Sequence, residues 1–196
     1  MPVKDIRPIK ARLREKYRQM RIDLTSEEKE EKDKSIATRI FRLWQYREND
    51  VLLTYVSTDI EVDTKRIIVQ ALQDGKKVAV PRCVPGTRSM EFYFIDGLDD
   101  LEPGSFGVLE PRPVAEKLLT DFSKGICLVP AFSYDWSGFR LGYGKGYYDR
   151  FLSGFNGNMI GVCYSECVRP HLPHGRYDRA VELLVTDRFL RRVERK

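Results

Sequence analysis

The sequence predicts an α/β fold in which a mostly parallel sheet is flanked by helices. Short apolar, β-branched runs at residues 51–56 and 77–80 have the composition of buried strands. Between them, a helical segment begins near Asp63 and should end at Gly75. The order strand, helix, strand is typical of parallel pairing, because parallel strands need a crossover connection. The chain of 196 residues suffices for one substantial domain, so we expect residues 1–196 to form a single domain.

The N-terminal part of the chain predicts two helices before the first strand. Pro8 suits a first helical turn, and apolar residues then recur at helical spacing to about Ile22, namely Ile9, Leu13, Tyr17 and Met20. Thr25 and Glu28 have the spacing of a capping box and should open a second helix. Its inward face would carry Ile36, Ile40 and Leu43. The other faces of the first helix carry Lys10, Arg12, Arg14, Lys16, Arg18 and Arg21, and such a run normally marks a solvated surface.

Further strands are expected at residues 90–95, 125–129, 159–163 and 181–186, the last of these being the final strand. Residues 96–113 are rich in turn-forming residues and should make an ordered excursion over the surface. Residues 147–152 predict a short helix.

Composition limits the class of protein. With 42% hydrophobic and 32% charged residues, the chain should be globular, and no apolar run approaches the roughly 20 residues of a membrane span. The charged start lacks the apolar segment of a signal peptide, so we expect a cytoplasmic protein without a membrane partner. The net charge of +5 suits an anionic partner but does not separate nucleic acid from a polyanionic small molecule.

The cysteines and histidines do not indicate a metal site. No zinc-site spacing relates Cys83, Cys127, Cys163 and Cys167, and we expect four reduced thiols. His171 and His174 are the only histidines in the sequence; they are three residues apart and lack the i, i+4 spacing of a helical metal pair.

The glycine-rich stretch within residues 129–152 carries the functional prediction. Gly142, Gly144 and Gly146 occupy alternate positions, where they permit positive φ and close approach of a ligand to the backbone. Arg140 and Lys145 supply cations, and Asp149 follows as a possible magnesium ligand. Because an apolar strand precedes the loop and a helix follows it, the helix dipole would also favour an anion.

Two phosphate motifs fail on this stretch. Lys145 is followed by Gly146 rather than Ser or Thr, which excludes the Walker pattern, and Tyr147 stands where the dinucleotide fingerprint needs glycine. A glycine-rich turn with tyrosines packed over it is the alternative to a ligand site. Glu61, at the end of the first strand, could likewise be a ligand contact or simply solvated, since ligands of open α/β sheets gather at the carboxyl ends of strands.

Residues Arg140 to Asp149, together with Pro130, Asp135 and Gly138 upstream, resemble the signature of the 5-formyltetrahydrofolate cyclo-ligase, or methenyltetrahydrofolate synthetase, family. The resemblance extends from Lys10 to Thr186. It implies a fold similar to that of sugar-phosphate isomerases and coenzyme A transferases. It also implies ATP-dependent cyclisation of 5-formyltetrahydrofolate to 5,10-methenyltetrahydrofolate, with ADP and phosphate released and with ATP and Mg²⁺ as cofactors.

The resemblance assigns roles to individual residues. Lys145 and Arg140 would be catalytic. ATP would contact Lys10, Arg14, Arg140, Leu141, Gly142, Tyr143, Gly144, Lys145, Gly146, Tyr147 and Tyr148. The folate would contact Val56, Glu61, Tyr143, Gly144, Lys145, Gly146 and Tyr147, and magnesium would be held by Asp149 and Asp178. The chain departs from the family pattern at Cys167, where glutamine is usual, and at Tyr177, where histidine is common.

Two other functions remain possible from the residues. A sugar-phosphate isomerase of similar fold would use the same loop for a phosphate but would need a general base and no ATP. An RNA-binding module would stack bases on exposed aromatic residues beside the cations of the loop. We expect the cyclo-ligase, with a reduced folate and ATP as its partners, no nucleic acid, and a monomeric state.

Overall fold

The computed structural model describes residues 5–193, apart from the side chain of Phe106. Its helices are α1 (Arg7–Ile22), α2 (Ser26–Arg42), α3 (Trp44–Glu48), α4 (Lys65–Gln73) and α5 (Tyr147–Gly154). The strands of the main sheet are β1 (Val51–Leu53), β2 (Lys77–Cys83), β3 (Met90–Ile95), β6 (Ile126–Pro130), β9 (Asn158–Val162), β11 (Leu183–Val185) and β12 (Leu190–Arg192). Two smaller sheets contain β4 (Leu101–Pro103) with β5 (Leu109–Pro111), and β7 (Ser133–Asp135) with β8 (Arg140–Leu141) and β10 (Val168–Arg169).

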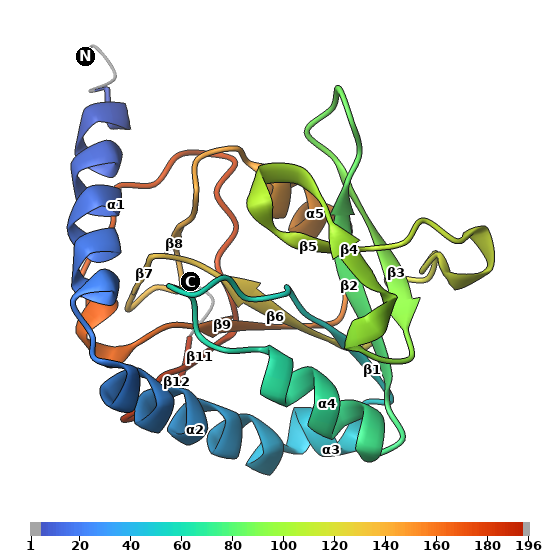
Figure 1. Cartoon of the computed structure of the whole chain (residues 1–196). Helices are drawn as coiled ribbons and strands as arrows, with labels where there is room; N and C mark the ends of the chain where they lie inside the picture. Colours follow the sequence, from blue (N-terminus) through green and yellow to red (C-terminus); the bar gives the residue numbers. More distant parts are fainter. Residues whose placement is uncertain (1–4, 194–196) are drawn as a thin grey trace.

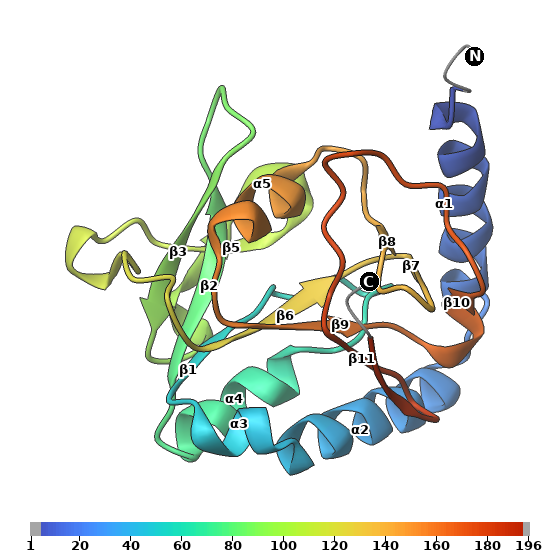
Figure 2. The same ribbon diagram turned by 180° about the vertical axis from the view of Figure 1, so that it is seen from behind.

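The main sheet is mixed and mostly parallel, as predicted. Its seven strands follow the order β12-β11-β9-β6-β1-β2-β3, and the pairs from β11 to β2 are all parallel. Only the edge pairs β2 with β3 and β11 with β12 are antiparallel. Helices α2, α3 and α4 lie along one face of the sheet and α5 lies on the other (Figures 1 and 2). The carboxyl ends of the parallel strands therefore point to one common edge.

The helices form where the periodicity places them. The Thr25 hydroxyl accepts a hydrogen bond from the Glu28 backbone N–H, and the Glu28 carboxylate accepts one from the Thr25 backbone N–H. The predicted capping box therefore begins α2. Ile36 and Ile40 are fully buried beneath the sheet. Gly75 has φ of 78° just beyond the end of α4, which explains the stop. None of the described helices combines the length and apolarity needed to cross a membrane.

Several expectations about the elements were wrong. A third helix, α3, precedes the first strand, and β12 follows the strand expected to be last. Every residue of β12 is exposed, so it carries no apolar signal. Ile9 is 40% exposed, although its spacing favoured the inner face of α1. Arg21 is 4% exposed, although it belongs to the cationic run that predicted a solvated surface.

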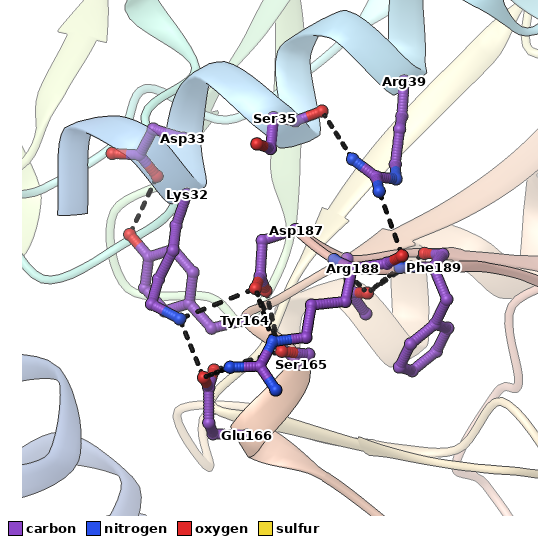
Figure 3. Close-up of polar contacts among 11 residues, drawn as sticks. Lys32, Asp33, Ser35, Arg39, Tyr164, Ser165, Glu166, Asp187, Arg188 and Phe189 are labelled. Atoms are coloured by element: carbon purple, nitrogen blue, oxygen red, sulfur yellow. Dashed lines mark hydrogen bonds and ion pairs between the residues drawn. The ribbon is translucent and has the colours of Figure 1, made fainter. Parts of the chain in front are cut away.

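A network of ion pairs fastens α2 to the segments that follow β9 and β11 (Figure 3). Lys32 Nζ lies 2.8 Å from Glu166 Oε1 and 3.5 Å from Asp187 Oδ2. Asp187 also accepts the Ser165 backbone N–H at 2.6 Å, and Arg188 reaches Glu166 at 3.1 Å. The segments after β9 and β11 are thus both held against α2.

Candidate functional site

A cleft of about 870 Å³ opens at the carboxyl ends of β1 and β6. It is bordered by α1, the segment after β1, the β2–β3 hairpin, the region around β5, and the loop that joins β8 to α5. Every residue to which the family resemblance assigned a role lines this cleft: Lys10, Arg14, Val56, Glu61, Arg140, Leu141, Gly142, Tyr143, Gly144, Lys145, Gly146, Tyr147, Tyr148, Asp149 and Asp178. The position agrees with the rule that ligands of open α/β sheets bind beyond the carboxyl ends of the strands.

The loop between β8 and α5 is shaped by two of its three glycines. Gly144 has φ of 91° and Gly146 has φ of 77°, whereas Gly142 does not adopt positive φ. Gly146 is the N-cap of α5 and offers no side chain to the first N–H groups of the helix. Those groups lack intrahelical partners and carry the positive end of the helix dipole. The start of α5 can therefore receive an anion from the cleft.

Arg14 joins α1 to this loop. Its Nε donates to the Gly142 carbonyl oxygen at 2.7 Å, and a Cβ atom at Gly144 would lie only 3.1 Å from the guanidinium carbon. Position 144 thus requires glycine for two reasons, the positive φ and the close approach of the Arg14 side chain. Burial lowers the pKa of Arg14, which remains charged because an arginine pKa stays far above neutral pH.

Arg140 lies beneath the loop with 6% exposure. Its Nη2 donates to Asp149 Oδ1 at 2.5 Å, and its Nη1 donates to the Arg179 carbonyl oxygen at 2.7 Å. The Arg179 N–H completes a triangle by donating to the same Asp149 oxygen at 3.3 Å. Arg140 therefore positions the Asp149 carboxylate, while Lys145 occupies an exposed position on the loop itself.

Lys10 pairs with Asp178 across 168 positions of sequence. Lys10 Nζ lies 2.6 Å from Asp178 Oδ2, which also accepts the Gly175 N–H at 3.0 Å. Burial alone would raise the pKa of Asp178, but the hydrogen bonds from Lys10 and Gly175 outweigh it and hold that pKa below its ordinary value. Asp178 is accordingly a carboxylate at neutral pH, and its Oδ1 accepts no hydrogen bond from residues 5–193.

Glu61 is fixed at the end of the segment that follows β1. Its Oε2 accepts the Thr58 backbone N–H at 2.8 Å and the Thr58 hydroxyl at 2.9 Å, and its Oε1 accepts the Tyr143 hydroxyl at 2.6 Å. Burial, followed by the charge of Glu61, raises the pKa of Tyr143 and keeps its hydroxyl a donor. Behind Glu61, the Tyr164 hydroxyl donates to Asp33 of α2 at 2.8 Å (Figure 3).

The aromatic residues of the loop line the cleft and do not form a flat, open surface on which bases could stack. The Tyr143 ring packs on Phe132 with 4.5 Å between centroids. The Tyr148 hydroxyl is buried and has no hydrogen-bond partner within residues 5–193, although the side chain lines the cleft. Tyr143 is 43% exposed, but Tyr147 and Tyr148 are half-buried. The loop thus presents one exposed ring and not the several that stack bases on an RNA-binding surface.

The residues that depart from the family pattern lie away from the cleft. Cys167 is 1% exposed and sits in the core, and Tyr177 is 81% exposed. His174 stacks on Phe139 at 3.6 Å, and within the described part of the chain no three His, Cys, Asp or Glu residues form a potential metal cluster.

Sequence reasoning missed several residues that line the cleft: Arg18, Tyr55, Thr58, Cys83 and Glu110. Arg18 had the i+4 spacing from Arg14 as a signal. Glu110 lies in the stretch Gly107 to Pro111, which also resembles the family but to which no role was given.

The comparisons with known proteins agree on one family. Residues 6–187 match the model of the 5-formyltetrahydrofolate cyclo-ligase family. A probable 5-formyltetrahydrofolate cyclo-ligase of Schizosaccharomyces pombe is 31% identical over 141 residues, 64% of this chain and 69% of the relative. The 5-formyltetrahydrofolate cyclo-ligase of Haemophilus influenzae is 27% identical over 171 residues, 85% of this chain and 91% of the relative. The structure of a 5,10-methenyltetrahydrofolate synthetase from Aquifex aeolicus superposes with a TM-score of 0.81 at 30% identity, covering 96% of this chain and 94% of that one.

The loop geometry predicts an order of stability among glycine substitutions. Gly144→Ala should lower the free energy of unfolding most, because alanine would suffer both the positive φ and the crowding of Arg14. Gly146→Ala should lower it by roughly 1 to 2 kcal/mol, from the positive φ alone, since no atom lies within 4 Å of the added carbon. Gly142→Ala should remain close to the parent. Urea denaturation without ligand measures all three, and equal losses at 144 and 142 would contradict the role given to φ.

Proposed function

We propose that this chain, which belongs to the 5-formyltetrahydrofolate cyclo-ligase family, closes the folate ring by first transferring the γ-phosphoryl group of ATP to the formyl oxygen of its substrate. Its activity is the conversion of 5-formyltetrahydrofolate to 5,10-methenyltetrahydrofolate, and the family uses ATP. The observation that carries the assignment of roles is the single cleft in which the cations of α1, the glycine loop and Glu61 meet.

The chemistry explains why ATP is consumed. A formyl group on nitrogen is amide-like and a poor electrophile, and ring closure requires the loss of its oxygen. Transfer of the γ-phosphoryl group to that oxygen breaks its bond to ADP and turns the oxygen into a leaving group. The neighbouring N10 of the folate then attacks the formyl carbon, loses its proton, and phosphate departs. Phosphoryl transfer asks the protein mainly for positioning and charge stabilisation, so no nucleophilic side chain is needed.

The nucleotide would lie between α1 and the glycine loop. Lys10 and Arg14 are four residues apart on one face of α1 and border the cleft, so they can meet two phosphate groups together. The N–H groups of residues 144–148 surround the start of α5, where they and the helix dipole favour an anion. Lys145 would face the transferring phosphoryl group as the loop's own cation, and Leu141 and Gly142 would complete the wall through their backbone.

Asp149 and Asp178 fit a magnesium ion bound to the nucleotide. Each uses one oxygen for contacts with the protein, Asp149 with Arg140 and Asp178 with Lys10, and the other oxygen accepts no hydrogen bond from the described residues. Magnesium usually takes one or two protein carboxylates together with phosphates and waters. The ion would neutralise negative charge on the phosphates during transfer.

The folate would occupy the side of the cleft formed by Val56, Glu61 and the loop. Val56 is 3% exposed and supplies an apolar contact, while Glu61 Oε1 can accept one folate N–H beside its bond to Tyr143. The rings of Tyr143 and Tyr147 border the cleft from the loop and can pack against the folate.

We further propose that the protein acts as a cytoplasmic monomer. All the residues that would bind ATP and the folate come from one chain, so no second copy is needed to complete the cleft. Cys127, Cys163 and Cys167 are buried as thiols, which suits a reducing compartment. A molar mass of one chain in solution would support the monomer.

The activity is tested by one absorption spectrum taken with and without ATP. Purified protein mixed with 5-formyltetrahydrofolate and magnesium should form the conjugated methenyl product only when ATP is present. Product formed without ATP, or none formed with it, would contradict the proposal.

Lys145→Met should lower kcat by about 100-fold, the scale seen when a preorganised donor to the transition state is lost. The side chain is exposed, so the fold should remain intact. Lys34→Met, at an exposed position of α2 outside the cleft, is the matched control and should leave kcat unchanged. A folded Lys145→Met enzyme with the parent rate would remove Lys145 from the mechanism.

Asp149→Asn should raise the magnesium concentration needed for half-maximal rate more than it raises the KM for the folate. The substitution also weakens the ion pair with buried Arg140, so some stability is lost independently of magnesium. The magnesium titration therefore has to be set against thermal unfolding of the same variant. Equal changes in the magnesium requirement and the folate KM would point to a purely structural role.

A further inference from the structure

The cleft contains a second buried carboxylate that the roles proposed above leave unused. Glu110 lies in β5, is 5% exposed and lines the cleft with Cys83 and Tyr147. The described residues give it no ion pair. Arg82, the neighbour of Cys83 in β2, pairs with Glu102 at 2.8 Å instead. Burying a carboxylate without a cation is costly, so a ligand that supplies donors to it would be held strongly.

The Glu110 carboxylate can accept further hydrogen bonds. Its Oε1 accepts the Cys83 backbone N–H at 3.2 Å and the Cys83 thiol donates to the carboxylate as well, so about two of its four lone-pair sites remain. Burial first, and then the charge of Glu110 and the hydrogen bond to it, raise the pKa of the Cys83 thiol. Gly104 makes room for it, because a Cβ atom there would lie 2.5 Å from Oε2.

Glu61 cannot offer the same pair of oxygens. Two donors from Thr58 already occupy its Oε2, and a carboxylate oxygen has about two lone-pair sites. Only Oε1, which also accepts the Tyr143 hydroxyl, has capacity left. Glu61 therefore suits a single N–H donor, whereas Glu110 has lone-pair sites left for two donors.

A reduced folate presents such a pair. The pyrimidine edge of its pterin ring carries the N3–H and the 2-amino group side by side, and this edge matches a carboxylate as a guanidinium does. The wall beside Glu110 is apolar, with Val108 and Leu109 from the same segment lining the cleft. In addition, Tyr147, the first residue of α5, lines the same cleft.

Resting on the proposed function, we propose that Glu110 binds the N3–H and 2-amino edge of the folate and so makes the enzyme specific for 2-aminopterins. Glu61 then contacts another N–H of the substrate, at the side of Tyr143. The pterin would lie between two carboxylates of different capacity, with its orientation set by the one that can accept two donors.

The first test is kinetic. Glu110→Gln keeps an acceptor for the Cys83 N–H but loses the charge and one acceptor oxygen, so the KM for 5-formyltetrahydrofolate should rise about ten- to a hundredfold while the KM for ATP stays constant. Glu102→Gln, on the adjacent β4 and outside the cleft, is the matched control and should change neither constant. An unchanged folate KM in a folded Glu110→Gln enzyme overturns the proposal.

The second test identifies the donor that Glu110 binds. The parent should bind 5-formyltetrahydrofolate at least about tenfold more tightly than its 2-desamino-2-methyl analogue, because the analogue leaves one buried acceptor unpaired. Glu110→Gln should bind the two equally. If the preference survives in Glu110→Gln and disappears in Glu61→Gln, the edge belongs to Glu61 and the proposal is overturned.

Two further measurements keep the test decisive. If Glu110→Gln does not fold, Glu110→Asp withdraws the carboxylate by one methylene and should show the same loss of preference, while a retained preference would overturn the proposal. The ATP dependence of the parent with the natural substrate is measured separately. A failure there would reject the proposed function, whereas a failure confined to the analogue comparison rejects only the role of Glu110.

Discussion

The buried guanidinium of Arg140 is the constraint on which the site depends. A cation with 6% exposure needs compensation, and it finds it in the Asp149 carboxylate and the Arg179 carbonyl oxygen. These contacts tie β8 to the first turn of α5 and to the segment that carries Asp178. The exposed loop between Arg140 and Asp149 is thereby anchored at both ends. Its glycines can therefore keep positive φ angles and remain accessible to a ligand while the loop stays ordered.

The same pairs suggest how the cleft remains stable before a ligand arrives. Lys10 is matched by Asp178, and Arg140 by Asp149, so two of the cations close to the expected phosphates already have a carboxylate partner. A nucleotide with its magnesium ion would bring both signs of charge. In the proposed complex, the phosphates would replace Asp178 as the partner of Lys10, and magnesium would bind the Asp178 carboxylate. Side chains that are already paired would then change partners, and no unpaired charge would be newly buried. This limits the desolvation cost of binding.

The sequence predicted most of the fold because periodicity and capping are local. The buried stripe of α2 and the Thr25 capping box both follow from residues within one helix. It failed where burial is decided by distant contacts. The exposed strand β12 forms by pairing with β11, and Arg21 differs from Arg18 only in what lies opposite it. In the site, the residues of the glycine loop could be found from the motif. Lys10 and Asp178 were known only through the family resemblance, and for Glu110 that resemblance marked the stretch from Gly107 to Pro111 without giving the glutamate a role.

Arg21 shows why the missed contacts matter for function. Its Nη2 donates to the carbonyl oxygens of Ala131 at 2.5 Å and Phe132 at 3.1 Å, and its Nη1 approaches the Ile60 carbonyl oxygen at 3.4 Å. One side chain near the end of α1 therefore joins the segment after β6 to the segment that carries Glu61. Because α1 is rigid, this anchor also fixes the positions of Arg14 and Lys10 relative to the cleft. These residues lie two and three turns closer to the N-terminus of α1 than Arg21. In the proposed complex, the nucleotide side and the folate side of the cleft would thus be held in register by a buried cation that contacts neither ligand.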